Sequence, residues 1–435
     1  MLWFPLSCYE PLAMPEMSSS EQSLFTAALG LQPPWKVVST DFDPAAKRID
    51  LEVGFERGAR FACPGCGAAD QPVHDSRRRS WQHLHFFEHR AYIHADVPRV
   101  RCGDCGKTTQ VPAPWAREGS GFTQLFEALV VTLCAQMPVQ AVARHLGVGD
   151  DAVWRVLHHY VDAARAQEDF SEVTAVGIDE TAARRGHDYI SVFHDLRASR
   201  VLFACSGRDQ HTVARFVDDL AAHGGDANAI EAACIDMSKA YIAGVGKHLP
   251  HAEITFDGFH VIQLANAAVD EVRRAEVREK PVLKHTRWVW LKDGWRWTKR
   301  QLDTFHTLSR TQLKTARAWR LKNALRELYA QAPPRDIAEA ELSRWFSWAR
   351  RCRLEPFKRL ALTIKAHWNG ILNAFDSRLN NGGVEATNGL IQAAKARARG
   401  YRTTRNLITM TYLIGARLSH LPASPYTTTS SSAAA

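Results

Sequence analysis

The spacing of apolar residues separates a helical stretch of the chain from a strand-rich one. Between 121 and 160 apolar residues recur every three or four positions, which is the period of a helix that buries one face. Pro138 can open the first of two short helices, and Gly147-Val148-Gly149 can turn the chain before the second. The apolar positions of the two helices are Val139, Val142, Ala143, Leu146, Val153, Val156 and Leu157. The pattern predicts a helix-turn-helix.

The second helix of such a motif enters the major groove of DNA. Arg155 and His158 lie on this helix outside its apolar positions, so we expect both side chains to contact DNA. A helical hairpin that binds nothing has the same pattern, and this alternative stays open.

From 173 onward the chain changes to short apolar runs of the length of buried strands. We expect strands at 174–179, 187–195, 199–206, 232–236 and 254–257, with a helix at 210–222 and another that begins at Ser238. This order of elements fits a ribonuclease H-like fold, in which the first and fourth strands lie side by side.

Each of these two neighbouring strands ends in a carboxylate. Asp179 ends the first and Asp236 ends the fourth. Two carboxylates at the ends of adjacent strands can share divalent cations about 4 Å apart, which is the geometry for in-line phosphoryl transfer. An aspartate that ends a strand is also common in a turn or a helix cap, so the pair counts for more than either residue alone.

A third acid is expected from a helix that opens after Asn381-Gly382-Gly383. Glu385 lies in its first turn, and residues 3, 7, 10 and 14 positions later share its face. These residues are Asn388, Gln392, Lys395 and Arg399. We expect this face to hold a metal ion at Glu385 and to run along a phosphate backbone from there to Arg402. A solvent-exposed face with one acid near the helix N-terminus is the alternative.

Four of the nine cysteines form two C-x-x-C knuckles, each followed by glycine. They are Cys63, Cys66, Cys102 and Cys105. A two-residue gap lets both sulfurs of one knuckle reach one ion, so the spacing predicts one structural zinc with four thiolate ligands. An alternating run at 91–101 predicts a strand that leads into the second knuckle. His74, His83, His85, His89 and His94 lie nearby, and one of them could replace a cysteine, although four thiolates already complete the shell.

Charge is concentrated in two blocks of the chain. Residues 271–330 hold sixteen Lys and Arg against six Asp and Glu, and residues 391–420 hold six Lys and Arg and no acid. Such blocks attract polyanions, of which nucleic acid is the most common, although solvated charged helices have the same composition. The 148 residues between Asp236 and Glu385 predict an inserted helical domain. Its tryptophans suit either core packing or stacking on bases, and Trp290, Trp295 and Trp297 are the candidates for stacking.

Other classes of protein are disfavoured. No apolar run approaches the roughly 18 residues that span a bilayer, so no membrane partner is expected. The first twenty residues contain no Lys or Arg and therefore lack the charged start of a secretory signal. Residues 244–248 resemble a phosphate-binding loop but have Tyr241 in place of its first glycine and His248 after the lysine, which disfavours ATP binding.

Together these motifs resemble those of bacterial insertion-sequence transposases of the ISL3 family, which are DDE-type enzymes. The matching stretches are the four cysteines, 78–84, the helix-turn-helix, 177–180, 235–238, 259–261 and 381–389 with the Arg399-Gly400-Tyr401-Arg402 sequel. The resemblance covers about residues 30 to 420.

The resemblance implies that Asp179, Asp236 and Glu385 are the catalytic triad and bind two Mg²⁺ or Mn²⁺ ions. It implies that the N-terminal zinc and helix-turn-helix region recognises terminal inverted repeats, that target DNA is a second partner, and that the protein acts as at least a dimer. A bacterial cytoplasmic protein associated with the nucleoid is expected. Asp257 and His260 are expected to orient the acids, although a capped helix start explains the pair equally well. A non-catalytic zinc and helix-turn-helix regulator is the rival function.

The expected fold is a multidomain α/β protein, with a ribonuclease H-like core, a helical insertion, and a zinc-binding domain and helix-turn-helix ahead of the core. The expected divisions are a poorly ordered 1–30, a zinc-binding domain at 31–117, a helix-turn-helix domain at 118–168, core segments at 169–270 and 379–422, an insertion at 271–378, and a disordered tail at 423–435.

Overall fold

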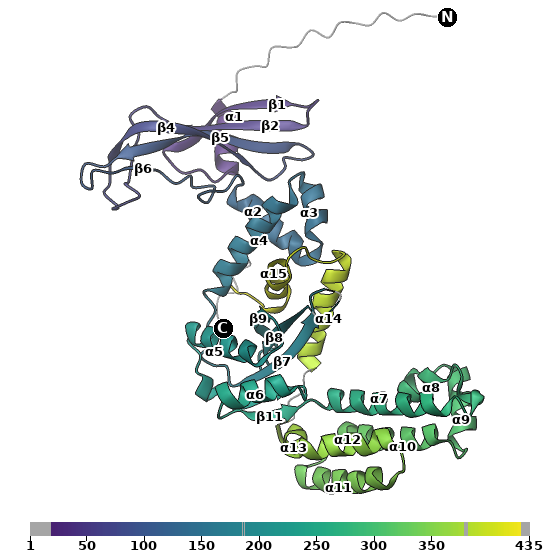
Figure 1. The fold of residues 1–435 in the computed structure, drawn as a ribbon. Helices are drawn as coiled ribbons and strands as arrows, with labels where there is room; N and C mark the ends of the chain where they lie inside the picture. The colour runs from purple at the N-terminus through teal and green to yellow at the C-terminus, as the bar shows by residue number, and fades with distance from the viewer. Residues whose placement is uncertain (1–18, 185, 187, 378–381, 428–435) are drawn as a thin grey trace, which may run out of the picture. The chain divides into compact units, whose positions relative to one another are not determined.

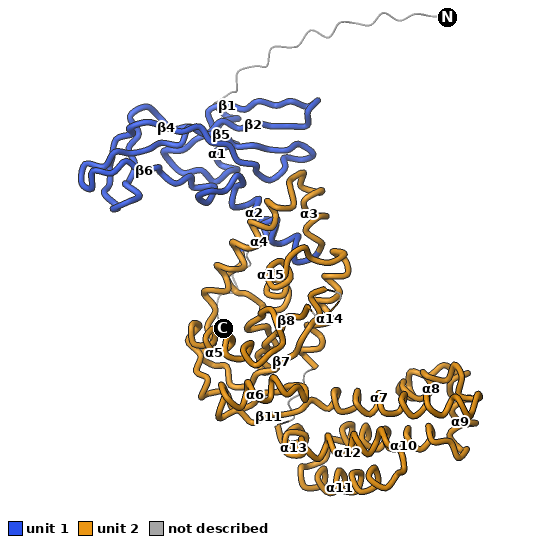
Figure 2. The backbone as a smooth tube through the Cα atoms, in the orientation of Figure 1, with its two compact units in different colours: residues 1–136, 422–435 blue, residues 137–421 orange. Residues whose placement is uncertain are grey.

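The computed structural model describes residues 19–184, 186, 188–377 and 382–427. The chain divides into two compact units, residues 1–136 with 422–435 and residues 137–421 (Figure 2). This division falls inside the stretch 118–168 that was expected to form one domain. Residues 1–18 and 428–435, which include most of the expected disordered ends, lie outside the described residues, as does Asn381.

The first unit contains a mixed sheet, in which some strand pairs are antiparallel and one is parallel. Its strand order is β1-β2-β5-β4-β3, and β6 pairs with β5. The strands are β1 (Trp35–Asp43), β2 (Arg48–Phe55), β3 (Arg60–Phe61), β4 (Gln71–Gln82), β5 (Arg90–Arg101) and β6 (Thr108–Gln110). Ile93, Ala95 and Val97 of β5 alternate with more exposed residues and are fully buried, as the period of two requires. The strand predicted at 91–101 is therefore present.

The described residues of the first unit form two helices, α1 (Ser19–Ala28) and α2 (Gln124–Gln136). The expectation that residues 1–30 are poorly ordered is wrong for α1. Phe25 and Leu29 pack against the buried residues of the sheet, and Thr26 Oγ1 accepts a hydrogen bond from Val37 N. These contacts anchor a helix whose own sequence is too short to be stable alone.

The second unit contains a five-stranded sheet in the order β11-β10-β7-β8-β9. The strands are β7 (Ala175–Ala182), β8 (Tyr189–Asp195), β9 (Arg200–Ser206), β10 (Ala232–Ile235) and β11 (Glu253–Phe256). β7 pairs antiparallel with β8 on one side and parallel with β10 on the other. The first and fourth strands of this region therefore lie side by side, as the sequence predicted.

Helices cover this sheet (Figure 1). α5 (Gln210–Ala222) and α6 (Lys239–His248) pack on each other, with the short η1 (Ala227–Ala229) between them in the chain. α6 contains residues 244–248, so the segment that resembles a phosphate-binding loop is helical. A Cβ on Gly244 would lie 2.7 Å from a methyl group of Val213 in α5, so this glycine permits close packing of the two helices.

The helix-turn-helix is formed by α3 (Val139–Leu146) and α4 (Asp150–Arg165). Pro138 precedes α3, and Gly147 ends it with a positive φ of 68°. All seven apolar positions named from the sequence are buried. Two further helices, α14 (Gly382–Arg397) and α15 (Thr404–Gly415), lie near the sheet, where α14 contacts β7 and α15 contacts both β9 and α4.

A helical arm follows β11, as the insertion of 148 residues predicted (Figure 1). It comprises α7 (Gly258–Glu276), η2 (Pro281–Leu283), α8 (Arg287–Leu291), η3 (Gly294–Arg296), α9 (Lys299–Ser309), α10 (Lys314–Gln331), α11 (Arg335–Arg351), α12 (Glu355–Ala366) and α13 (Trp368–Ser377). α7 runs without a break across the division expected at 270. The arm therefore begins inside a continuous helix.

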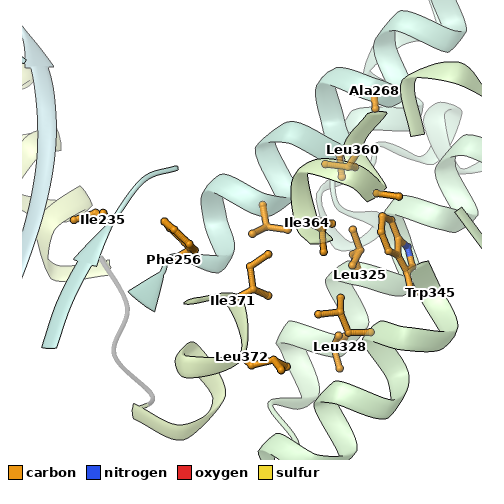
Figure 3. Packing of buried hydrophobic residues seen from close by; sticks show 14 of the residues in the cluster. Ile235, Phe256, Ala268, Leu325, Leu328, Trp345, Leu360, Ile364, Ile371 and Leu372 are labelled. Carbon is orange, nitrogen blue, oxygen red and sulfur yellow. The ribbon is translucent and has the colours of Figure 1, made fainter. Parts of the chain in front are cut away.

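One hydrophobic cluster joins the arm to the sheet (Figure 3). Ile235 and Phe256 of β10 and β11 are followed by Ile371 and Leu372 of α13, then by residues of α10, α11 and α12. A Cβ on Gly370 would lie 2.5 Å from the Phe256 ring, so α13 can approach β11 only because residue 370 is glycine. Trp290 and Trp345 belong to this cluster and are buried.

The burial of Trp290 corrects one expectation. Its ring is fully buried, and its indole nitrogen donates a 3.1 Å hydrogen bond to Thr286 Oγ1. It is a core residue and cannot stack on a base without unfolding its surroundings. Across the described part of the chain, no helix is both long and apolar enough to cross a membrane.

Candidate active site

Asp179 lies in β7, and Asp236 directly follows β10, the parallel strand that pairs with β7. Gly177 of β7 pairs with Cys234 of β10, and each aspartate lies two residues further along its own strand direction. Residues in the same register point to the same face of a sheet, and neighbouring strands are about 4.8 Å apart. β7 continues to Ala182, so Asp179 lies within the strand and not at its end.

Helix α14 contacts β7 through the face that the sequence predicted, which carries Asn388, Gln392 and Lys395. Asn388 Nδ2 donates a 2.7 Å hydrogen bond to Asp179 Oδ2. Further along, Gln392 Nε2 donates to Thr181 Oγ1 and to the Ala182 carbonyl, and Lys395 Nζ donates to the same carbonyl at 2.6 Å. These three side chains therefore hold helix to strand. Their contact with DNA, expected from the sequence, stays a prediction.

The same attachment places Glu385 near Asp179, because Glu385 lies one turn before Asn388 on the same face. Burial raises the pKa of Glu385, and the nearby Asp257 and Asp179 carboxylates raise it further. Burial also raises the pKa of Asp179, and the charge of Asp236 adds to that rise. Asp179 and Glu385 therefore lie in an environment that disfavours their ionised forms.

Two buried polar atoms in this environment have no hydrogen-bond partner among the residues that the structure describes. They are Oε1 of Glu385 and Oδ1 of Asn388. A buried oxygen without a partner is costly in a folded protein, unless an ion or water that the protein binds satisfies it.

Asp257 and His260 flank the acids from the start of α7. Asp257 Oδ1 accepts a 3.1 Å hydrogen bond from Phe259 N and so caps the helix. The charge of His260 acts to lower the pKa of both Asp179 and Glu385. The helix-cap explanation is therefore correct for Asp257. A role for the pair in orienting the acids stays a prediction.

Glu180 is a neighbour that the sequence reasoning did not single out. Burial raises its pKa, while Arg208, at 3.4 Å, lowers it and Asp236 raises it. Its position next to Asp179 in the sequence was the available signal.

The three carboxylates are not packed around a single point. Within the described residues, the only group with three or more possible metal-ligand atoms within 4.8 Å of one another is Cys63, Cys66, Cys102 and Cys105. Two ions about 4 Å apart, each about 2 Å from its oxygens, need carboxylates spread more widely than that. The three carboxylates are therefore spread more widely than the four cysteines.

The four cysteines form a compact site in the first unit. Cys63 Sγ lies 3.8 Å from Cys105 Sγ, and Cys66 Sγ lies 3.5 Å from Cys102 Sγ. Zinc–sulfur bonds of about 2.3 Å in a tetrahedron place sulfurs roughly 3.8 Å apart. Backbone hydrogen bonds, first from Gly65, lower the pKa of Cys63 to about 6, which favours the thiolate that binds metal. The cluster is a site for one structural zinc.

Two of the histidines near the cysteines form hydrogen bonds with other side chains. His94 Nδ1 lies 2.6 Å from Ser80 Oγ, and its Nε2 lies 2.5 Å from Asp50 Oδ1. His83 Nδ1 lies 2.8 Å from Thr123 Oγ1. Both belong to hydrogen bonds of the sheet and its neighbours.

The residues expected to contact DNA differ in their exposure. Arg155 on α4 is exposed, as are Arg399 and Arg402 after α14. His158 is half-buried, and its Nδ1 lies 2.9 Å from Thr409 Oγ1 of α15. Burial lowers the pKa of His158, which favours its neutral form. His158 therefore joins α4 to α15, and its contact with DNA stays a prediction.

A basic cavity of about 760 Å³ lies at the end of α14. Its cationic lining residues are Arg184, Lys395, Arg399 and Arg402. Arg399 and Gly400 have positive φ angles of 57° and 96°, so the chain turns sharply as it leaves the helix. Arg184 donates a hydrogen bond to the Arg402 carbonyl, which holds the turn against the end of β7. Arg184 was not identified from the sequence.

An α/β core with two register-matched aspartates, a glutamate on a covering helix, a helix-turn-helix and a four-cysteine site defines a DNA-processing enzyme of the DDE class. Comparison with known proteins agrees. Residues 176–411 match the transposase family profile for ISL3, residues 111–161 match the helix-turn-helix domain of transposase family ISL3, and residues 59–105 match the zinc-finger of transposase IS204/IS1001/IS1096/IS1165. The chain belongs to the ISL3 family of transposases.

Two relatives illustrate the likeness. The transposase for insertion sequence element IS1557 of Mycobacterium tuberculosis is 28% identical over 424 residues, which cover 90% of this chain and 94% of that protein. The transposase for insertion sequence element IS1001 of Bordetella parapertussis is 28% identical over 348 residues, which cover 78% of this chain and 85% of that protein.

Proposed function

We propose that this transposase binds the terminal inverted repeats of its insertion sequence and cuts and joins DNA strands by two-metal phosphoryl transfer on a ribonuclease H-like core. Asp179, Asp236 and Glu385 would hold two Mg²⁺ or Mn²⁺ ions. Two observations support the proposal. Gly177 and Cys234, each two residues before an aspartate, pair on adjacent parallel strands, and the Asn388 hydrogen bond to Asp179 attaches to β7 the helix that carries Glu385.

The residues fit divalent ions. Magnesium prefers hard oxygen ligands, and Glu385 offers a buried oxygen that no described residue satisfies. A bound cation would offset the burial that raises the pKa of Asp179 and Glu385. When bound, the ions would activate water as a nucleophile and stabilise the leaving 3′ oxygen.

The protein's own contribution is positioning. Asn388 Nδ2 donates to one oxygen of Asp179 and Glu180 N donates to the other, so the carboxylate is held in one orientation. β7 holds Asp179 within a strand, Asp236 follows the last residue of β10, and α14 carries Glu385. Because the acids bind and orient without forming a covalent bond to DNA, no nucleophilic side chain is needed.

The basic turn after α14 supports a path for DNA. Arg399 and Arg402 line the same cavity as Lys395, whose Nζ donates to the end of β7, the strand that carries Asp179. Phosphates bound there would lie within one helix length of Glu385. Arg155 on α4 is the proposed base contact, and at least a dimer is proposed because two element ends must be paired.

The cost of the acidic cluster disfavours the non-catalytic regulator. Buried carboxylates with raised pKa values reduce the stability of a protein that gains nothing from them. A protein that only binds DNA needs no such cluster.

Strand cleavage of a duplex that carries the element's end tests the proposal. Asp179→Asn, Asp236→Asn and Glu385→Gln should each reduce Mg²⁺-dependent cleavage by at least 1,000-fold, while the affinity for the same duplex stays within about threefold. Retained cleavage in any of the three variants would refute the assignment of that acid. A covalent adduct between protein and DNA would refute the metal mechanism.

A further inference from the structure

An open cavity of about 990 Å³ adjoins the acids on the side of the helical arm. It is lined by residues of α7, the α8–η3 region, α10 and α13. Asp257 belongs both to this lining and to the surroundings of Glu385, whose pKa it raises. A ligand in the cavity therefore reaches the edge of the catalytic cluster.

Two large aromatic side chains of the cavity lining are exposed to solvent. Phe259 is 54% exposed and Trp288 is 53% exposed. Deeper in the lining, Tyr329 stacks on Phe375 with ring centroids 5.2 Å apart and planes inclined by 22°. Exposed large rings around a concavity are typical of binding sites for flat apolar groups.

The lining also has polar atoms that could recognise the edge of a ring. Asn266 Oδ1 and Tyr329 Oη are buried and have no hydrogen-bond partner within the described parts of the chain. The amide oxygen can accept a hydrogen bond, and the phenol can donate one. The Tyr329 ring also lies against the start of α7, since a Cβ on Gly258 would be 2.6 Å from it. The phenol is thus held in a fixed place.

The charges of the lining favour an anionic attachment. Asp293 is paired with Arg326 at 2.5 Å, which leaves Lys292 and Arg296 as the cations of this part of the lining. Arg287, outside the lining, lies 3.7 Å from Asp270 and has its guanidinium 5.1 Å from the centre of the Trp288 ring. A flat ring with hydrogen-bonding edges, joined to a phosphate and placed next to the catalytic acids, is a nucleotide of DNA.

We propose that this cavity receives one base of the substrate DNA, unstacked from the duplex near the strand to be cut. The inference rests on the proposed function and specifies a substrate subsite within it. Trp288 and Phe259 would stack on the base, while Asn266 and Tyr329 would bind its edge. Unstacking the base would open the backbone beside the phosphate that the acids attack.

The chain offers a matched control for this cavity. Trp295 lies on the same arm and is 78% exposed, but it does not line the cavity. Trp295→Ala therefore removes an exposed tryptophan of the same arm and leaves in place the residues proposed to stack on the base and bind its edge, although its ring contacts Arg296 of the lining. Thermal unfolding of each variant shows whether the fold is retained, and Phe259→Ala provides a second route if Trp288→Ala unfolds.

The test uses the full chain and duplexes of the element's end, with 2-aminopurine placed at one position at a time across the cleavage site. In Ca²⁺, which supports binding without cleavage, the wild-type complex should change the fluorescence at one position at least threefold. Trp288→Ala and Phe259→Ala should abolish this change, and Trp295→Ala should preserve it. In Mg²⁺, Trp288→Ala should slow cleavage at least tenfold, and an abasic site at the responsive position should restore most of the rate.

Three outcomes separate the alternatives. Wild-type cleavage without a responsive position would overturn the subsite alone. An equal loss in Trp295→Ala and Trp288→Ala would overturn it as well, because general binding to the arm would explain both. No cleavage of any element end by the wild-type protein would overturn the proposed function and the subsite with it.

Discussion

Asn388 and Asp179 are 209 residues apart in the chain, and a 2.7 Å hydrogen bond joins their side chains. The bond is the contact between α14 and the catalytic strand that lies nearest to Glu385. It helps to orient the Asp179 carboxylate and attaches to β7 the helix that carries Glu385. The late segment of the chain therefore completes a site that the early strands begin.

Removing this bond should impair catalysis without removing an acid. Asn388→Ala should slow Mg²⁺-dependent cleavage about 10- to 100-fold, because ligands that lose their orienting partner bind metal less well. Raising the Mg²⁺ concentration should recover part of the rate. Gln392→Ala is the matched control, since it removes contacts of the same helix with β7 further from Asp179.

If Gln392→Ala lost as much activity as Asn388→Ala, the hydrogen bond to Asp179 would have no special role. Docking of α14 on β7 would then account for both results.

The acids should destabilise the protein when no metal is bound. Burial raises the pKa of Asp179 above its usual 3.8 and that of Glu385 above its usual 4.5, so the folded state binds protons more tightly than the unfolded state. Stability from these groups is therefore greatest below pH 4 and falls as the pH rises through the raised values. In EDTA at pH 7, Asp179→Asn and Glu385→Gln should unfold at higher temperature than wild type.

Divalent ions should reverse this order. Mn²⁺ should raise the melting temperature of the wild-type protein by ligand binding and leave the amide variants nearly unchanged. Variants that melt lower than wild type in EDTA would indicate that the carboxylates are structural.

Loss of the zinc site should both unfold the first unit and abolish specific binding to the element's end. Cys102→Ser should remove the zinc, unfold the unit that contains the cysteines, and abolish specific binding to the element's end, because a structural zinc contributes on the order of 10 kcal/mol to small folds. Cys134→Ala changes an equally buried cysteine of the same unit outside the cluster. Metal analysis should find one zinc per chain in wild type and Cys134→Ala, and none in Cys102→Ser.

Arg155 should contribute to sequence recognition. Arg155→Ala should weaken binding to the element's end about 5- to 100-fold and weaken binding to unrelated DNA much less, which competition titrations at fixed salt can separate. Arg350→Ala removes an exposed arginine of the arm and should leave the preference for the element's end unchanged. Equal losses on specific and unrelated DNA would assign Arg155 to phosphate contact alone.

Local patterns predicted much of this fold because short-range rules decide it. Helix α5 runs from Gln210 to Ala222, the predicted bounds, since its apolar period and the Asp209 cap are both local. The cysteine spacing likewise predicted the zinc site. The adjacency of β7 and β10 followed from the order of elements in a known fold, and the pairing of their residues agrees with it.

The sequence did not predict the hydrogen bonds that polar side chains form between distant segments of the chain. The face of α14 reads as a DNA-binding face, yet Asn388, Gln392 and Lys395 donate to β7. His158 reads as exposed, yet it meets Thr409. Trp290 was a candidate for base stacking in the sequence and Trp288 was not, yet the packing of the arm buries the first and exposes the second. Such pairings depend on tertiary contacts that no local pattern contains.

We propose that three acids, from β7, the end of β10 and α14, together hold a pair of metal ions. Anomalous diffraction from crystals of the protein bound to its element's end and grown with Mn²⁺ tests this most directly. The account predicts two manganese peaks about 4 Å apart, in contact with oxygens of Asp179, Asp236 and Glu385. Crystals that contain bound DNA but no manganese at these three side chains would contradict it.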